Sequence, residues 1–183
     1  MRVWTRQHES VLKVLNDTGR YIMKTENVSL DMPEYKYIMM EVYMWLANNM
    51  PTINIKPKDV SLPIWVVFKS DAAMLPSPNM CLLELEIDEN IVYHLNINKW
   101  GMILNYSYIP SDEIDDKRHT ELLKKYGISD AKAYMSNFYP TLKSEIKNSW
   151  MRLFDDNISI NDGKECYGLI WEIKKEWVVK VLE

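Results

Sequence analysis

The sequence predicts a single α+β domain over residues 1–183, with a mixed or antiparallel split sheet, strands at both ends of the chain and helices between them. The chain has 183 residues, of which 47% are hydrophobic and 26% charged, enough for one buried core. Strand-like apolar patterns occur near both termini, whereas the central part shows helical spacing. The sequence contains no repeats and no linker-like stretch. We therefore expect one domain without an internal boundary.

Each expected element follows from the spacing of its apolar residues and from the residues at its ends. Helices carry apolar residues three or four positions apart, strands carry them at alternate positions, and Gly or Pro marks most boundaries. In chain order we expect a strand at 2–5, helices at 7–16 and 33–48, a loop at 51–63, strands at 64–68 and 81–87, helices at 96–105, 112–126, 130–137 and from 140, and strands at 166–173 and 177–182.

Two of these elements have the clearest patterns. The helix that starts at Pro33 carries a continuous apolar stripe, formed by Tyr35, Ile38, Met39, Val42, Tyr43 and Leu46. Near the C-terminus, the segment 174–176 separates two β-rich stretches, so we expect a hairpin there. The strand at 2–5 must pair with strands from later in the chain to close the sheet.

Composition narrows the class of protein. The formal net charge of -4 argues against coating nucleic acid or anionic membrane by charge alone, although a local basic patch is compatible with it. Cys81 and Cys166 are too few for a disulfide framework. The sequence has neither an apolar stretch of membrane-spanning length nor a signal peptide. We therefore expect a cytoplasmic protein that does not bind membranes.

Standard catalytic motifs are missing from the sequence. It contains no phosphate-binding loop, no dinucleotide-binding glycine pattern and no nucleophile elbow. His8, His94 and His119 are scattered without the spacing of a metal site, so no metal is expected. The chain is instead rich in Trp (seven) and Tyr (eleven), whose rings combine a large contact area with a polar group. Such residues suit either a core or a ligand cleft.

Glu172 is the candidate catalytic carboxylate. In a continuous strand at 166–173, alternation gives Glu172 the same face as the smaller residues Cys166, Gly168 and Ile170. The bulkier face, with Tyr167, Leu169, Trp171 and Ile173, is expected to point toward the core. A cleft could form on the smaller face, where partial burial would raise the pKa of the Glu172 carboxyl. An exposed strand glutamate without a chemical role is the alternative.

Several short motifs, most of them containing Trp or Tyr, are distributed along nearly the whole chain. The first is Val3-Trp4-Thr5-Arg6-Gln7, and those that follow are Tyr43-Met44-Trp45, Pro63-Ile64-Trp65, Leu83-Glu84-Leu85-Glu86-Ile87, Trp100 with Leu104-Asn105, the segment 150–154 and the segment 170–178. Together they resemble an uncharacterised family of bacterial domains that opens with hydrophobic-Trp-Thr-x-Gln. This resemblance implies a bacterial origin and a single domain, and it carries no activity with it.

The start of the chain resembles the opening of ADP-ribosyltransferase-like toxins. It has a short first strand that ends in a polar residue, then a helix, then Gly19. Trp4 and Thr5 stand here where those toxins carry His or Arg. The resemblance implies a split sheet around a nicotinamide cleft, with NAD as the substrate. It also implies a glutamate on a late strand, which Glu172 matches.

The same resemblance implies roles for five further residues. Thr5 and Gln7 would hydrogen-bond the ribose or the amide of NAD, Trp65 or Tyr43 would stack on the nicotinamide ring, and Trp4 would close the pocket. Glu172 would stabilise the oxocarbenium-like ribose that forms when the nicotinamide bond is cleaved. Taken singly, each of these aromatic residues fits the core better than a ligand site.

The leading hypothesis is an ADP-ribosyltransferase-like bacterial effector, such as the toxin of a toxin-antitoxin or phage-defence system. It would transfer ADP-ribose from NAD to an acceptor that the sequence does not identify, either protein or nucleic acid. An antitoxin protein is then the expected partner. The alternative is a non-catalytic binding module whose aromatic cleft holds a peptide, a nucleotide or a partner protein, and a third class is an enzyme acting on a different small substrate.

Overall fold

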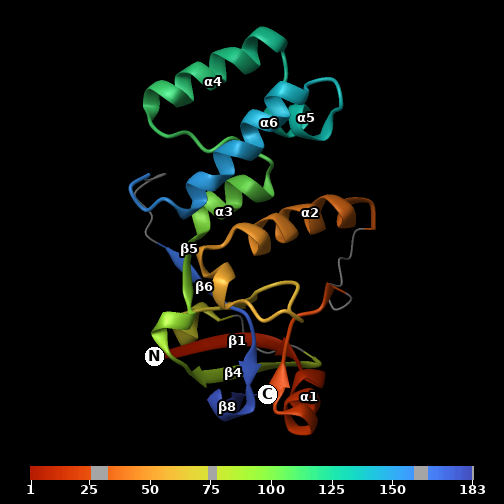
Figure 1. The fold of residues 1–183 in the computed structure, drawn as a ribbon, viewed down its shortest axis with the longest axis vertical. Coiled ribbons are helices and arrows are strands. Elements are labelled where there is room, and N and C mark those ends of the chain that lie inside the picture. Colours follow the sequence, from red (N-terminus) through yellow and green to blue (C-terminus); the bar gives the residue numbers. More distant parts are fainter. Residues whose placement is uncertain (26–32, 74–77, 159–164, 183) are drawn as a thin grey trace. The chain divides into compact units, whose positions relative to one another are not determined.

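The chain contains both helices and antiparallel strands, and the helices α3 to α6 follow one another without an intervening strand, which confirms the α+β class (Figure 1). The structure is a computed structural model that describes residues 1–25, 33–73, 78–158 and 165–182. Its principal elements are β1 Arg2–His8, α1 Ser10–Thr18, β2 Arg20–Tyr21, α2 Pro33–Asn49, η2 Pro51–Ile55, β3 Ile64–Val66, β4 Met80–Glu86, β5 Tyr93–Asn96, α3 Ile97–Leu104, α4 Glu113–Tyr126, α5 Asp130–Met135, α6 Pro140–Ser149, η5 Trp150–Phe154, β6 Cys166–Ile170, β7 Ile173–Lys174, η6 Lys175–Trp177 and β8 Val178–Leu182.

The described residues group into two units by their contacts. Unit 1 comprises Met1–Leu95 together with Cys166–Glu183, and unit 2 comprises Asn96–Glu165. Unit 1 holds the three sheets, whereas unit 2 holds the helices α3 to α6. Within the described ranges, no helix is both long and apolar enough to cross a membrane.

Three small sheets build unit 1, in the strand orders β1-β4-β8, β2-β7 and β3-β6-β5. The pairs β1-β4, β4-β8, β2-β7 and β3-β6 are antiparallel. Both terminal strands therefore flank β4 in one sheet, and the first strand pairs with later ones as predicted (Figure 1).

The core of unit 1 follows from the strand periodicity of two. Along β1, Val3, Thr5 and Gln7 are buried, and they lie opposite the buried Leu85, Leu83 and Cys81 of β4. Side chains of β3 and β6, including Ile64, Val66 and Ile170, join the same buried cluster. The core thus lies against one face of the sheet that contains β1.

Strand β1 is longer than predicted, and the first helix starts later. The ladder with β4 continues to His8, opposite Met80, because pairing along the whole of β4 outweighs the local helical pattern that predicted a helix from residue 7. Helix α1 then ends at Gly19, whose φ of 74° is the left-handed cap expected there. In α2, Tyr35 and Ile38 lie outside the described side chains, whereas Val42 and Leu46 are buried as predicted.

The predicted C-terminal hairpin is wrong. β6, β7 and β8 pair with β3, β2 and β4, so each joins a different sheet. The chain bends at Trp171, whose indole N–H donates to the carbonyl oxygen of Thr52 at 3.0 Å, and η6 turns it again before β8. These turns prevent the two segments from lying against each other.

The bend also changes the face on which Glu172 lies. Ile170 and Ile173 both join the core cluster of unit 1, although they are three positions apart and regular alternation would put them on opposite faces. Glu172 therefore does not share the face of Ile170, as a continuous strand would require. The smaller face is also filled at Gly168, where side chains of the core occupy the space beside the backbone.

We predict that Gly168→Ala lowers the free energy of unfolding by about 1–3 kcal/mol, because an added methyl group overpacks this site. A Cβ atom at Gly168 would lie 2.5 Å from Val66 Cγ2 and 2.9 Å from Val92 Cγ1. Chemical denaturation of the purified variant measures the change. Gly101→Ala is the matched control, since nothing lies within 4 Å of its added Cβ and Ala favours a helix over Gly. Equal stability of the two variants would contradict the prediction.

An aromatic stack forms the centre of unit 2. The ring of Tyr134 stacks on Tyr106 at 5.1 Å and on Trp150 at 5.0 Å between centroids. The indole N–H of Trp150 donates to the carbonyl oxygen of Ser107 at 3.0 Å, which satisfies the polar group of this buried side chain. The stack fixes α5, η5 and the segment after α3 with respect to one another.

Candidate functional site

Two of the predicted site residues, Thr5 and Gln7, lie inside unit 1 and bind each other. The side-chain amide of Gln7 donates to Thr5 Oγ1 at 2.8 Å, and Thr5 Oγ1 donates to the carbonyl oxygen of Trp65 at 2.7 Å. Only 2% of Thr5 and 7% of Gln7 is exposed. Their polar groups therefore hold β1 against β3, and a ligand would have to compete with these bonds.

Trp4 lies on the other face of β1 from Thr5, because neighbouring strand residues point to opposite sides. It is half-buried and stands opposite Glu84 of β4. Its backbone exchanges two hydrogen bonds with Val67, of 2.9 and 2.8 Å. The structure thus brings the backbones of Trp4 and the end of β3 together but separates the Trp4 ring from Thr5 and Gln7.

Trp65 and Tyr43, the two residues predicted as alternatives for stacking, contact each other. The Trp65 ring lies edge-to-face with Tyr43 of α2 at 6.4 Å and with Tyr167 of β6 at 6.1 Å between centroids. We call these three half-buried residues the aromatic triad. Burial raises the pKa of the Tyr43 phenol, so this hydroxyl is protonated at neutral pH. Sequence reasoning assigned Tyr167 to the core and did not include it in the site.

Glu172 is held by basic side chains. Its Oε2 accepts a hydrogen bond from Arg20 Nε, and Lys174 Nζ lies 3.8 Å from its Oε1. Arg20 also binds Asp59 with two bonds of 2.7 and 3.2 Å. The hydrogen bond to Asp59 and the charges of both carboxylates raise the pKa of Arg20. The carboxylate side chain of Glu172 is 18% exposed, so solvent still reaches it.

The strand pair β3-β6 carries Trp65 and Tyr167 of the aromatic triad, and Glu172 lies just beyond the end of β6. Trp65 pairs with Leu169, and Glu172 follows three residues later. Their Cα atoms therefore lie within about 16 Å of each other, given the spacing of paired strands and of an extended chain. The sequence contains no sign of the Arg20 bridge, because its partners are remote along the chain and only the fold brings them together.

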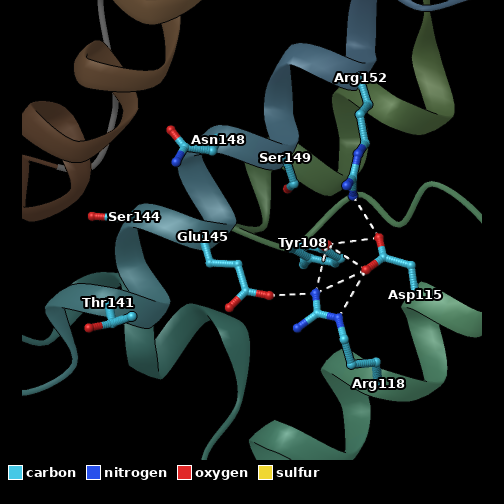
Figure 2. Close-up of a pocket in the computed structure, with 9 residues that line it drawn as sticks. All are labelled: Tyr108, Asp115, Arg118, Thr141, Ser144, Glu145, Asn148, Ser149 and Arg152. Atoms are coloured by element: carbon cyan, nitrogen blue, oxygen red, sulfur yellow. Dashed lines mark hydrogen bonds and ion pairs between the residues drawn. The ribbon is translucent and has the colours of Figure 1, made fainter.

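Unit 2 contains a polar pocket that the sequence analysis did not predict (Figure 2). It has a volume of about 480 Å³. Polar side chains from α4, α6 and η5 form most of its wall, and the lining residues are Tyr108, Asp115, Arg118, Thr141, Ser144, Glu145, Asn148, Ser149 and Arg152. Thr141, Ser144 and Asn148 come from one face of α6, since they are three or four residues apart.

Ion pairs neutralise the charges of this pocket. Arg118 Nη2 donates to Asp115 at 2.9 Å and to Glu145 at 2.6 Å, and Arg152 Nη1 donates to Asp115 at 2.8 Å (Figure 2). The Tyr108 hydroxyl adds a further bond to Asp115. Burial of Asp115 opposes ionisation, but hydrogen bonds from the backbone N–H of Ser111, from Tyr108 and from Arg118, together with the charge of Arg152, outweigh burial and hold the pKa of the Asp115 carboxyl well below the usual range. Two guanidinium groups thus balance two carboxylates and tie α4 to α6.

His119 lies behind this network and connects three helices. It is 3% exposed, its ring stacks on Tyr108 at 3.9 Å, and its Nε2 and Nδ1 lie 2.7 Å from Asp130 and 3.4 Å from Glu145. Burial lowers the pKa of the imidazole, yet the hydrogen bonds and charges of the two carboxylates outweigh burial and raise it. The protonated ring can donate to both carboxylates at once.

We predict that unit 2 loses stability as the pH rises above neutral. The pKa of His119 is above its ordinary value of 6.5 in the folded protein, so its stabilising contribution is complete below pH 6.5 and disappears as the pH passes the raised folded-state pKa. Chemical denaturation of the wild type and of His119→Gln between about pH 6 and pH 9 measures how the free energy of unfolding depends on pH. The stability difference between them should shrink with rising pH, and a constant difference would contradict the prediction.

Metal binding finds no support in the side-chain geometry. Among the residues that the structure describes, no group of three or more His, Cys, Asp or Glu side chains is arranged to hold a metal ion. Unit 1 contains the aromatic triad and the Glu172 carboxylate, and unit 2 contains the neutralised polar pocket.

The fold and these sites define an α+β protein with an aromatic surface in one unit and an ion-pair network in the other. The chain belongs to the family described as Domain of unknown function (DUF3841), whose model matches residues 2–179. This match confirms the expected membership of a family without an assigned activity over nearly the whole chain. The searches of curated proteins and of solved structures gave no match, and no comparison shows a resemblance to ADP-ribosyltransferases.

Proposed function

We propose that unit 1 binds NAD and transfers its ADP-ribose to an acceptor protein or nucleic acid. The observation that carries this proposal is the aromatic triad, a set of three partly exposed rings in contact with one another. Packing already fixes the orientation of the Trp65 ring, so little side-chain entropy is lost when a planar group stacks on it. The nicotinamide of NAD is such a planar group.

Glu172 supplies the chemistry in this proposal. The glycosidic bond between C1′ of the ribose and the nicotinamide nitrogen breaks, and nicotinamide leaves with the bonding electron pair. An O–H or N–H group of the acceptor donates an electron pair to C1′ and releases its proton to solvent. The ribose carries positive charge between these events, and the Glu172 carboxylate stabilises it.

Arg20 is a positioning residue in this scheme. Its guanidinium binds Glu172 and Asp59 together, which orients the Glu172 carboxylate. The pairing also offsets part of the negative charge that the ribose would meet. NAD binding therefore has to loosen the bond between Arg20 and Glu172 for the carboxylate to act.

The biological setting proposed for this activity is the bacterial cytoplasm. A protein that modifies protein or nucleic acid with ADP-ribose fits the toxin of a toxin-antitoxin or phage-defence system. An antitoxin protein would then be needed to restrain it.

A non-catalytic binding module is the second candidate. The observation that favours it is the set of bonds already made by the predicted NAD ligands: Thr5 and Gln7 are buried and bonded within the fold, and Glu172 is paired with Arg20. In such a module the triad alone would hold an aromatic group of a peptide, a nucleotide or a partner protein, and Glu172 would only stabilise unit 1.

We predict that Trp65→Ala weakens binding of a non-hydrolysable NAD analogue by roughly 3- to 10-fold, the loss expected for one aromatic stacking contact. Isothermal titration calorimetry of the purified protein measures it. Trp177→Ala is the matched control, because Trp177 is a half-buried tryptophan of unit 1 outside the triad. No heat with millimolar analogue, in protein shown to be folded by circular dichroism, would rule out NAD as the ligand.

We predict that Glu172→Gln leaves binding of the analogue within about 3-fold of the wild type but lowers NAD turnover by roughly 10²- to 10³-fold, the usual loss when one electrostatic group is removed from a transition state. Release of nicotinamide, followed by chromatography, measures turnover. The variant keeps the shape of the side chain and removes its charge. Analogue binding without turnover in the wild type, offered protein and nucleic-acid acceptors, would favour the binding module.

A further inference from the structure

The ion pairs of the polar pocket in unit 2 leave two charged groups partly unused. Arg118 makes its bonds to the described residues through Nε and Nη2, so its Nη1 has no partner among them. Glu145 accepts from Arg118 and lies beside His119 through Oε1, so its Oε2 is likewise unpaired within the described residues. Figure 2 shows this second oxygen directed away from Arg118. One ion pair therefore leaves a guanidinium donor and a carboxylate acceptor for a ligand.

Three further polar side chains of the pocket are available. Thr141, Ser144 and Asn148 of α6 line it and are exposed. Their side chains make no hydrogen bond to any other residue that the structure describes. A hydroxyl and a carboxamide can each donate and accept a hydrogen bond. This wall can therefore bind either kind of polar group.

The charges of the pocket favour a ligand without net charge. Arg118 and Arg152 are matched there by Asp115 and Glu145. An anion such as phosphate would meet two carboxylates together with the two guanidinium groups, and a cation would meet the reverse. A ligand that carries one charge of each sign keeps the balance and still uses both free groups.

The pocket offers no open aromatic ring for stacking. Tyr108 is the aromatic residue of the described lining, and only 5% of it is exposed. Its ring stacks on His119 at 3.9 Å between centroids, and the Arg152 guanidinium lies 5.2 Å from its centre. Nucleobases and sugars usually bind against an exposed ring. The pocket is therefore better suited to a small aliphatic ligand.

We propose that this pocket binds a free α-amino acid with an uncharged polar side chain. Its carboxylate accepts from Arg118 Nη1, its ammonium donates to Glu145 Oε2, and its side chain bonds to Ser144 or Asn148. This site is separate from the NAD chemistry proposed for unit 1.

The geometry of the ion pair supports this class of ligand. Arg118 Nη2 and Glu145 Oε1 are 2.6 Å apart, so the free donor and the free acceptor belong to side chains in direct contact. In an α-amino acid a single carbon atom separates the ammonium from the carboxylate, which places opposite charges equally close. The volume of about 480 Å³ falls in the range of small-molecule sites. Because the ion pairs are partly exposed, we expect a dissociation constant on the order of 0.1–1 mM.

Isothermal titration calorimetry of the full chain with L-serine, L-asparagine and L-glutamine tests this proposal. We expect binding of at least one of them. Its N-acetyl derivative lacks the ammonium charge and its amide lacks the carboxylate, so each should bind roughly 10-fold more weakly or less. Absence of heat with all three at about 10 mM overturns the proposal. An N-acetyl derivative that binds as tightly as its parent also overturns it and makes the pocket an anion site.

Variants locate the binding in this pocket. Glu145→Gln should weaken binding roughly 10-fold or more, because the ammonium loses a charged partner. Glu121→Gln is the matched control, since Glu121 is an exposed glutamate of α4 outside the pocket. Binding by folded Glu145→Gln that equals the control contradicts the proposal.

A second variant covers the case in which Glu145→Gln does not fold. Ser144→Ala combined with Asn148→Ala removes side chains that bond to no described residue, so the melting temperature should stay close to that of the wild type. Binding should weaken roughly 3- to 10-fold, the loss expected for one hydrogen bond. Thr120→Ala, at an exposed position of α4 outside the pocket, is the control. Unchanged affinity of the double variant overturns the proposal.

Discussion

Strand β1 connects the two three-stranded sheets of unit 1, and the arrangement of that unit depends on it. One edge pairs with β4 from Arg2 to His8, and the other edge exchanges hydrogen bonds with Val67 just after β3. Thr5 adds a side-chain bond to the backbone of Trp65. The core cluster forms against the face that this strand presents inward.

The same constraint decides which polar groups of unit 1 remain available. Buried hydroxyl and amide groups must be hydrogen-bonded, and Thr5 and Gln7 satisfy this requirement by binding each other and β3. Glu172 and the aromatic triad lie outside that inner network and retain contact with solvent. These partly exposed groups come from α2, β3, β6 and the segment that follows β6 rather than from the first strand.

The charged side chains are paired differently in the two units. In unit 2 the carboxylates of Asp115 and Glu145 are matched by two arginines, and His119 joins the network from its buried side. In unit 1 a single arginine is shared by Asp59 and Glu172. An exposed lysine lies near the same glutamate at a longer distance. Unit 1 also holds the ion pair between Arg2 and Glu84.

Local sequence determined the class of the fold and most of its elements. Apolar spacing and terminal residues located α2, α4 and α6, because a helix needs only contacts between residues three or four apart and a suitable cap. Asp112 and Gly127 define the two ends of α4 in the structure as they do in the sequence. Membership of the family was also predictable, since it depends on residue types and their order.

Tertiary structure alone decided the partners of the strands and of the charged groups. The three C-terminal strands separate into three sheets because the chain bends at Trp171, whose indole binds a carbonyl group 119 residues away. The pairing of Arg20 with Glu172 spans 152 residues, and the polar pocket gathers side chains from α4, α6 and η5. Periodicity reports which face of an element is buried, but it carries no information on which remote element covers that face. Such contacts are chosen by the packing of the whole unit.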